Sequence, residues 1–230
     1  MAIRVHGLVL AATLLFASLV GSESQAAPHA RDGFYLQLTT GLGLPHSAIT
    51  ADEDNTRATD HYADTQSGVS IGGSLLLGVP LRPGLALGVG GLFALFAPRD
   101  PGPTKNGQPY SQVDVKQPAF QTMSMVGPFV DIYPCPALGW HVQALVGYAQ
   151  VPFAQITPNP FFNGSPSGIG LMAGVGHDWW ISEHWSAGLL ARLTYANMKL
   201  AQTPYDDGIG SVSEHNTLVS PSLEASFTFH

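Results

Sequence analysis

From residue 33 onward, apolar and polar positions alternate along the chain with a period of two. In GWHVQALVGYAQV (139–151), Trp140 and Val142 fall on one parity, and His141 and Gln143 fall on the other. This period places alternate side chains on opposite faces of a β-strand. The pattern predicts eight strands, at residues 33–44, 68–79, 85–96, 119–133, 139–151, 168–181, 185–196 and 223–230. An even number of strands favours an antiparallel up-and-down sheet.

The connections between these strands alternate between long and short. The long ones are polar or rich in proline, at residues 45–66, 97–118, 152–167 and 197–216, and the short ones are 80–84, 134–138 and 182–184. We expect long loops at one end of the sheet and tight turns at the other, as in outer-membrane barrels.

The composition decides which face of the sheet meets the solvent. Only 11% of the residues are charged, the mean hydropathy is +0.13, and the minor parity carries mostly Gly, Ser, Thr and Gln. A soluble eight-stranded barrel would place its apolar parity inside and charges outside. Here we expect the apolar face outside, in lipid, which predicts an all-β fold: an eight-stranded antiparallel up-and-down transmembrane β-barrel. The net charge of −7 argues against nucleic acid as a partner.

The N-terminus has the pattern of a secretory signal peptide. Arg4 precedes the apolar, uncharged residues 7–21, and small residues flank a cleavage point after Ala26. We therefore predict a cleaved signal peptide (1–26) and one outer-membrane β-barrel domain (27–230). The alternative, an uncleaved anchor, is disfavoured because the apolar run is shorter than the roughly 20 residues of a spanning helix.

Aromatic residues gather near the predicted short turns. Amphipathic rings concentrate at membrane interfaces, so we predict an aromatic girdle at this edge of the barrel. Its predicted members are Trp140, Trp179, Trp185, Phe227 and Phe229. Ordinary core packing of these rings is the alternative.

Taken together, the chain resembles the eight-stranded outer-membrane barrels of the OmpA/OmpX type. The resemblance rests on the signal peptide, the eight amphipathic strands, the alternating connections and the terminal SFTF (226–229). It implies localisation in the cell outer membrane of a Gram-negative envelope, and recognition of Phe227 and Phe229 by the barrel-assembly machinery. His230, and Glu224 where such strands often carry glycine, depart from the family pattern.

Three ionisable residues fall on the inward parity. Arg192 and Glu224 lie on neighbouring strands at similar depth, and Asp131 faces them across the lumen. A buried charge is costly unless it is paired, so these three residues predict an interior salt-bridge network. A transport or catalytic role is the alternative.

Three other motifs predict no chemistry. His184 and Ser186 have the His-x-Ser spacing of some barrel lipid A deacylases, but the predicted topology puts them at the periplasmic turn, far from lipid A. The acidic stretch 51–64 lacks the glycine and closing glutamate of a calcium-binding EF-hand. Cys135 is a lone cysteine and has no partner for an internal disulfide. We therefore expect no enzyme activity, metal or cofactor.

The sequence predicts a structural or surface-interaction role. Eight strands enclose space for side chains or one small ligand. The alternative is a narrow pore or a small apolar ligand in the lumen, for which inward glycines leave room (Gly41, Gly72, Gly88, Gly90, Gly174 and Gly188). A lipid A-modifying enzyme is a third, less favoured hypothesis. Outer-membrane lipid and lipopolysaccharide are the expected partners, and we expect a monomer.

Overall fold

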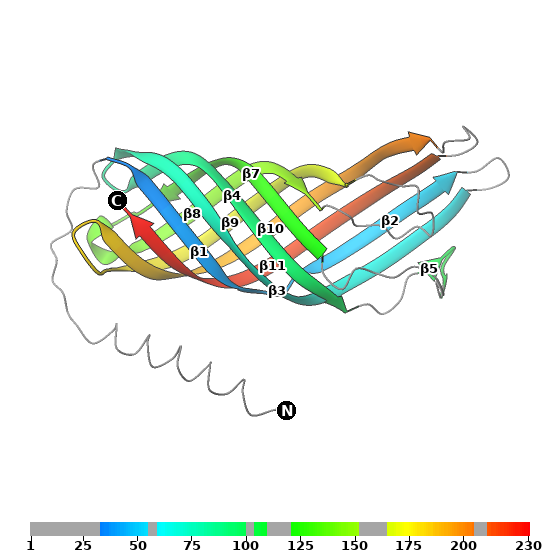
Figure 1. Ribbon diagram of the computed structural model, residues 1–230, viewed down its shortest axis with the longest axis horizontal. Coiled ribbons are helices and arrows are strands. Elements are labelled where there is room, and N and C mark those ends of the chain that lie inside the picture. Colours follow the sequence, from blue (N-terminus) through cyan, green and yellow to red (C-terminus); the bar gives the residue numbers. More distant parts are fainter. Residues whose placement is uncertain (1–32, 55–58, 100–103, 110–120, 152–164, 205–210) are drawn as a thin grey trace, which may run out of the picture.

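The computed structural model describes residues 33–54, 59–99, 104–109, 121–151, 165–204 and 211–230 (Figure 1). The predicted signal peptide and its cleavage site lie outside these ranges. The strands are β1 (Tyr35–Gly43), β2 (His46–Asp54), β3 (Thr59–Arg82), β4 (Leu85–Arg99), β5 (Thr104–Lys105), β6 (Gln108–Pro109), β7 (Gln121–Ile132), β8 (Trp140–Gln150), β9 (Ser167–Trp180), β10 (Trp185–Pro204) and β11 (Ser211–Phe229). A short 3₁₀ helix, η1 (Pro136–Leu138), lies between β7 and β8.

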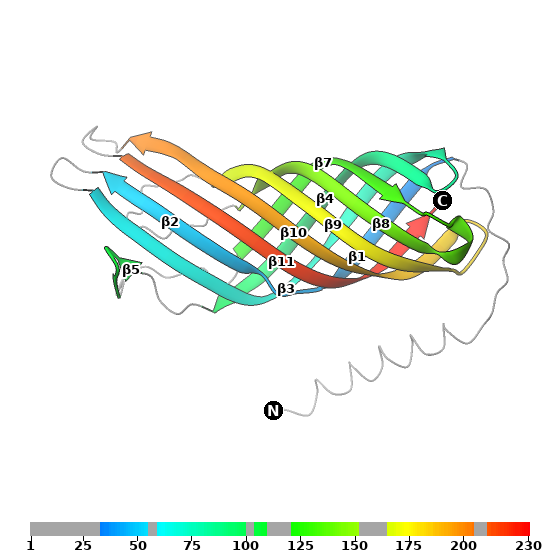
Figure 2. The same ribbon diagram turned by 180° about the vertical axis from the view of Figure 1, so that it is seen from behind.

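Antiparallel pairing closes these strands into a barrel. β1 pairs with β11 on one side and with β3 on the other, so the sheet has no open edge there. β2 continues β1 beyond Pro45 and keeps the same two neighbours, because proline interrupts the strand without changing its course. Counting β1 and β2 as one strand, and setting the short β5–β6 hairpin aside, gives the predicted eight (Figure 2).

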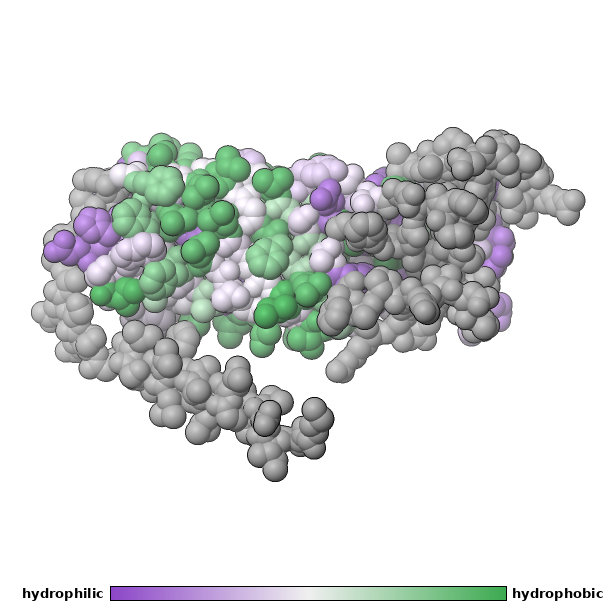
Figure 3. All heavy atoms as spheres, viewed as in Figure 1, coloured by the Kyte–Doolittle hydropathy of each residue, from purple (hydrophilic) through white to green (hydrophobic). Residues whose placement is uncertain are grey.

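The barrel wall is apolar on its outer face. Large apolar side chains point outward and are exposed, including Leu42 (63%), Phe93 (61%) and Ile169 (67%). Figure 3 shows these side chains covering the wall on the side of the barrel in view. Water is a poor solvent for such a surface and lipid is a good one, as the sequence predicted. The described residues contain no helix that is long and apolar enough to span a membrane.

The long connections are more regular than predicted. Strand pairing continues through much of them: residues 46–54 pair with 59–67 and with 211–219, and β10 runs on to Pro204. We call this extension of β2, β3, β10 and β11 beyond the apolar band the outer sheet (Figure 2). The prediction of loops at 45–66 and 197–216 was therefore wrong in large part. Backbone pairing needs no apolar face, so polar residues can continue a strand that has left the membrane.

The barrel interior is also fuller than predicted. Large apolar side chains share the inward face with the small polar ones, among them Leu76, Leu145 and Leu190, which are at most 3% exposed. Leu76 and Leu145 occupy the space beside Gly90, and the His141 ring occupies the space beside Gly176. Glycines therefore accommodate large neighbours from adjacent strands, and the room they were expected to leave is mostly taken.

Candidate functional site: the barrel lumen

Arg192 and Glu224 form an ion pair inside the barrel. The Arg192 Nη1 atom lies 2.8 Å from Glu224 Oε2, and both residues are 5% exposed. Strand register brings them together: Glu224 of β11 is opposite Leu190 of β10, so Arg192 is its diagonal neighbour on the inward face. Two buried charges at this distance neutralise one another, which offsets part of their desolvation cost.

Hydroxyl groups form hydrogen bonds with both members of this pair. Thr39 Oγ1 donates to Glu224 Oε2 at 2.5 Å, and Ser222 Oγ donates to Oε1 at 2.8 Å. Arg192 Nη2 donates to Ser74 Oγ at 3.0 Å. The carboxylate therefore accepts from donors on three strands, and the ion pair connects β10 and β11 to β1 and β3.

Asp131 belongs to a separate network nearer the short-turn end of the barrel. It accepts from the Tyr35 hydroxyl at 2.6 Å and from Gln143 Nε2 at 3.1 Å, and the His141 Nδ1 atom lies 2.9 Å from it. None of its contacts in the described part of the chain reaches Arg192 or Glu224. The expectation that all three charges share one network was wrong, because the described partners of Asp131 are His141 and Gln143 on the neighbouring β8 and Tyr35 on β1.

Ser186 takes part in a third buried group with Asp178 and the terminal histidine. Its Oγ lies 3.0 Å from His230 Nε2 and donates to Asp178 Oδ2 at 3.4 Å. Asp178 also accepts from the Tyr133 hydroxyl at 2.8 Å. His184 instead lies exposed in the turn and stacks on the Phe229 ring. The structure thus separates the two residues of the His-x-Ser motif, and the hydroxyl is fully buried.

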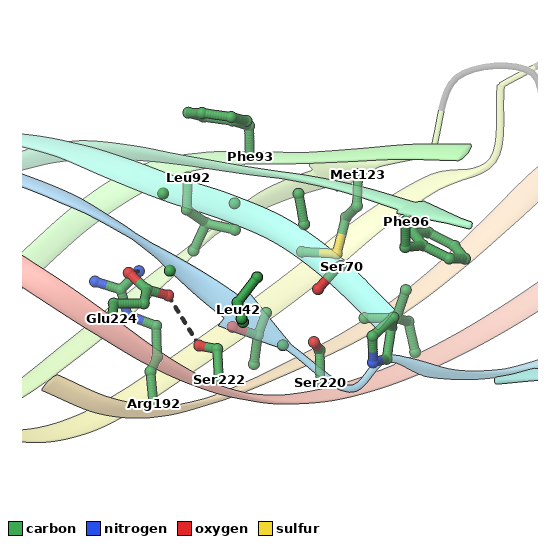
Figure 4. A pocket seen from close by; sticks show the side chains of 18 residues that line it. Leu42, Ser70, Leu92, Phe93, Phe96, Met123, Arg192, Ser220, Ser222 and Glu224 are labelled. Atoms are coloured by element: carbon green, nitrogen blue, oxygen red, sulfur yellow. Dashed lines mark hydrogen bonds and ion pairs between the residues drawn. The ribbon is translucent and has the colours of Figure 1, made fainter. Parts of the chain in front are cut away.

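A small cavity lies beside the Arg192–Glu224 pair. Its volume is about 30 Å³, enough for one water molecule. Figure 4 shows Arg192, Glu224 and serine side chains on one side of it, and Leu92, Met123 and Phe96 on the other. Gly41 and Gly72 line it too.

The lumen therefore changes character along its length. The short-turn end holds the two aspartate networks, and the ion pair lies between them and the outer half. Beyond the ion pair the interior holds an apolar cluster that contains methionines, alongside buried polar residues such as Ser70, Thr194 and Gln121. Its buried apolar members include Leu92, Phe96, Met123, Met125, Ala149, Val151, Met172, Ala196, Met198 and Leu218. Polar groups thus close the short-turn end by direct contact, and the apolar cluster lies beyond them.

The predicted girdle residues lie around the short-turn edge of the barrel. Trp140, Trp179 and Phe227 are exposed on the outer wall, and the Trp185 ring contacts those of Phe227 and Phe229. Trp180 differs from them, because its ring packs 4.8 Å from that of His230. At the opposite edge Tyr148 and Tyr195 are exposed as well. This second aromatic rim was not predicted from the sequence, although each tyrosine lies near the end of a stretch of alternating apolar and polar residues.

The acidic stretch near residue 51 is partly neutralised. Asp52 lies 2.6 Å from His61 Nδ1, and Asp60 lies 2.8 Å from Lys105 Nζ. The hydrogen bond from Lys105 lowers the pKa of Asp60. Among the described residues there is no cluster of three or more His, Cys, Asp or Glu side chains that could hold a metal ion.

Most of the polar residues that fill the lumen were not predicted from the sequence as members of a network. Tyr35, His141, Gln143, Asp178 and His230 are all buried polar residues of the two aspartate networks. The alternation of apolar and polar positions predicts that these residues face inward, and this was the only signal for them in the sequence. Their partners were not readable, because those lie 8 to 106 positions away in the chain.

Comparison with known proteins identifies the fold. No protein-family model matches the chain, and neither does any curated protein. The outer membrane protein OprG of Pseudomonas aeruginosa has a similar structure, with a TM-score of 0.51 over 88% of this chain and 99% of its own, at 13% identity. This chain has the fold of the small outer-membrane barrels.

Two further barrels are similar at lower scores. The outer membrane protein AlkL gives a TM-score of 0.43 at 12% identity, over 90% of this chain and 95% of its own. Neisserial surface protein A gives 0.38 at 11% identity, over 83% and 97%. At such identities the similarity concerns the fold, and the function has to be argued from the side chains of this chain.

Proposed function

We propose that this outer-membrane barrel is a non-conducting surface protein that presents its outer sheet to partners outside the cell. The carrying observation is the filled lumen: polar side chains close its periplasmic half by direct contact, and the cavity beside Arg192 has a volume of only about 30 Å³. A path for ions or solutes along the barrel axis would require this network to open, which leaves the outer sheet as the exposed functional surface.

The outer sheet suits such a role. β2, β3, β10 and β11 continue beyond the apolar band as a paired, polar sheet, so their shape does not depend on lipid. Its outward side chains include Thr50, Thr65, His215 and Lys199, all exposed. A rigid sheet of this kind loses little conformational entropy on binding, which favours recognition.

Binding of a small apolar ligand in the outer half of the lumen is a second candidate function. The observation that favours it is the apolar layer above Arg192, which contains Met123, Met125, Met172 and Met198. Methionine side chains are flexible and polarisable, so a layer of them can repack around ligands of different shapes. This ligand would enter from outside, because polar networks occupy the other end.

Purified barrel in planar bilayers tests the leading proposal. We expect no stepwise conductance, whereas stable single-channel steps would contradict a non-conducting barrel. Titration of the same sample with an apolar fluorescent probe separates the two candidates. Saturable binding that Met172→Trp abolishes would favour the luminal ligand, because the larger ring fills the space within the apolar layer. Binding that is unchanged in the variant would place the probe outside the lumen.

A further inference from the structure

The outer wall changes abruptly from apolar to polar at Tyr195. On β10, Leu193 and Tyr195 are followed on the same outward parity by Asn197 and Lys199. On β11 the change falls at Val219, which is directly opposite Tyr195. Tyrosine concentrates at membrane interfaces, so this boundary marks the level of the lipid headgroups in the outer leaflet.

At this boundary three polar side chains form a hydrogen-bonded row, and Lys199 lies next to it on β10; we call the four residues the headgroup ladder (Tyr195, Asn197, His215 and Lys199). Asn197 Nδ2 donates to the Tyr195 hydroxyl at 3.5 Å, and its Oδ1 lies 3.0 Å from His215 Nε2. An amide oxygen can only accept, so His215 Nε2 is the donor. His215 is directly opposite Lys199 across the β10–β11 pair.

Lys199 differs from two other cations of the described residues, which are ion-paired. Lys105 is paired with Asp60, and Arg192 is paired with Glu224. Within the described ranges no carboxylate lies at ion-pair distance from Lys199, which is exposed. An exposed cation at headgroup level is complementary to the phosphate of an anionic lipid.

An apolar groove on the lipid-facing wall begins at the same tyrosine. It crosses the outer surface from Tyr195 and Leu193 towards β8 and β7, and its volume is about 470 Å³. Ala144 and Ala173 line it with small side chains between the larger Val146, Leu171 and Leu193. This volume is within the range of small-molecule sites, and the surroundings are apolar throughout. Such a groove fits a hydrocarbon chain that lies against the wall.

We propose that this wall binds a lipid A molecule of the outer leaflet, with a phosphate on the headgroup ladder and an acyl chain in the groove. The Lys199 ammonium and the His215 ring face the phosphate, and the Tyr195 ring separates the polar headgroup from the apolar chain. The inference depends on residence in the outer membrane and is independent of whether the lumen conducts.

The test is binding of diphosphoryl lipid A to the folded barrel in neutral detergent, measured by native mass spectrometry. Lys199→Ala should weaken binding about tenfold, the order expected for loss of one charge-assisted phosphate contact, whereas Lys199→Arg should retain most of it. Ala173→Phe should weaken binding because the ring fills the groove. Arg82→Ala removes an exposed cation at the opposite end, and Ala191→Phe adds the same ring to the wall outside the groove. Neither should change the affinity.

Matched lipids identify the source of the phosphate. Lipid A without its phosphates should bind the wild-type barrel as weakly as diphosphoryl lipid A binds Lys199→Ala. Phosphatidylglycerol that bound as tightly as lipid A, with the same dependence on Lys199, would overturn the assignment to lipid A. Equal losses in Lys199→Ala and Arg82→Ala, or in Ala173→Phe and Ala191→Phe, would overturn the site itself. Dimers that form without lipid and are lost in Ala173→Phe would show that a second copy occupies the groove.

Discussion

At the scale of single residues, the interior of this barrel is organised by buried charges that have close partners. Arg192 and Glu224 neutralise each other, and Asp131 and Asp178 are each held by hydroxyl and imidazole groups. A buried charge that loses its partner keeps its desolvation cost without compensation. We therefore expect these residues to matter more for stability than the apolar residues of the outer wall.

Replacing Arg192 alone should be more harmful than replacing both members of its pair. Arg192→Leu leaves Glu224 uncompensated and should cost roughly 3 to 5 kcal/mol. Adding Glu224→Leu should restore part of this loss, because no unpaired charge remains. The readout is the temperature at which the folded, fast-migrating gel band disappears. Strictly additive destabilisation in the double-mutant cycle would show that the two residues do not stabilise each other.

At the scale of elements, the outer sheet extends four strands of the barrel beyond the lipid. Its strands pair along their backbones, and its inner face carries buried residues such as Ile49, Tyr62 and Glu214. Glu214 is opposite Ala51 and Leu200, two apolar neighbours. Burial raises the pKa of the Glu214 carboxyl from 4.5 to about 8. The stability of this sheet should therefore depend on pH.

The sign of this response follows from proton binding. Between pH 4.5 and pH 8 the folded protein keeps a proton on Glu214 that the unfolded chain releases. The stabilisation is thus fully present below pH 4.5 and is lost as the pH rises through 8. Glu214→Gln should remove this contribution. The difference in melting temperature between wild type and variant should then change steadily over this interval, and a constant difference would contradict a raised pKa.

At the scale of the whole molecule, the two ends of the barrel are chemically different. One end carries the short turns, exposed tryptophans and the lone Cys135, and the other carries the outer sheet. Bacterial outer-membrane barrels have short periplasmic turns and longer extracellular loops. We therefore expect the outer sheet at the cell surface and Cys135 in the periplasm.

Thiol labelling of intact cells checks this orientation. A maleimide attached to a polymer too large for porins should leave Cys135 unlabelled until the cells are lysed. Thr65→Cys, made in a Cys135→Ala background, should label without lysis, because Thr65 is exposed on the outer face of the outer sheet. Labelling of Cys135 on intact cells, with Thr65→Cys protected, would reverse the topology.

The sequence by itself determined the barrel: its strand number, its antiparallel order and its apolar outer wall. These follow from a period of two that each strand carries locally, which is why Trp140 and Val142 were placed correctly on the outer face. Parity and depth along the strands also predicted that Arg192 and Glu224 meet. Only the tertiary structure decided the partners of Asp131, which reaches Tyr35 and His141 because register and barrel closure bring their strands together. The tertiary structure also decided the outer sheet. Its polar residues show no apolar alternation in the sequence, and pairing with neighbouring backbones keeps them in strands.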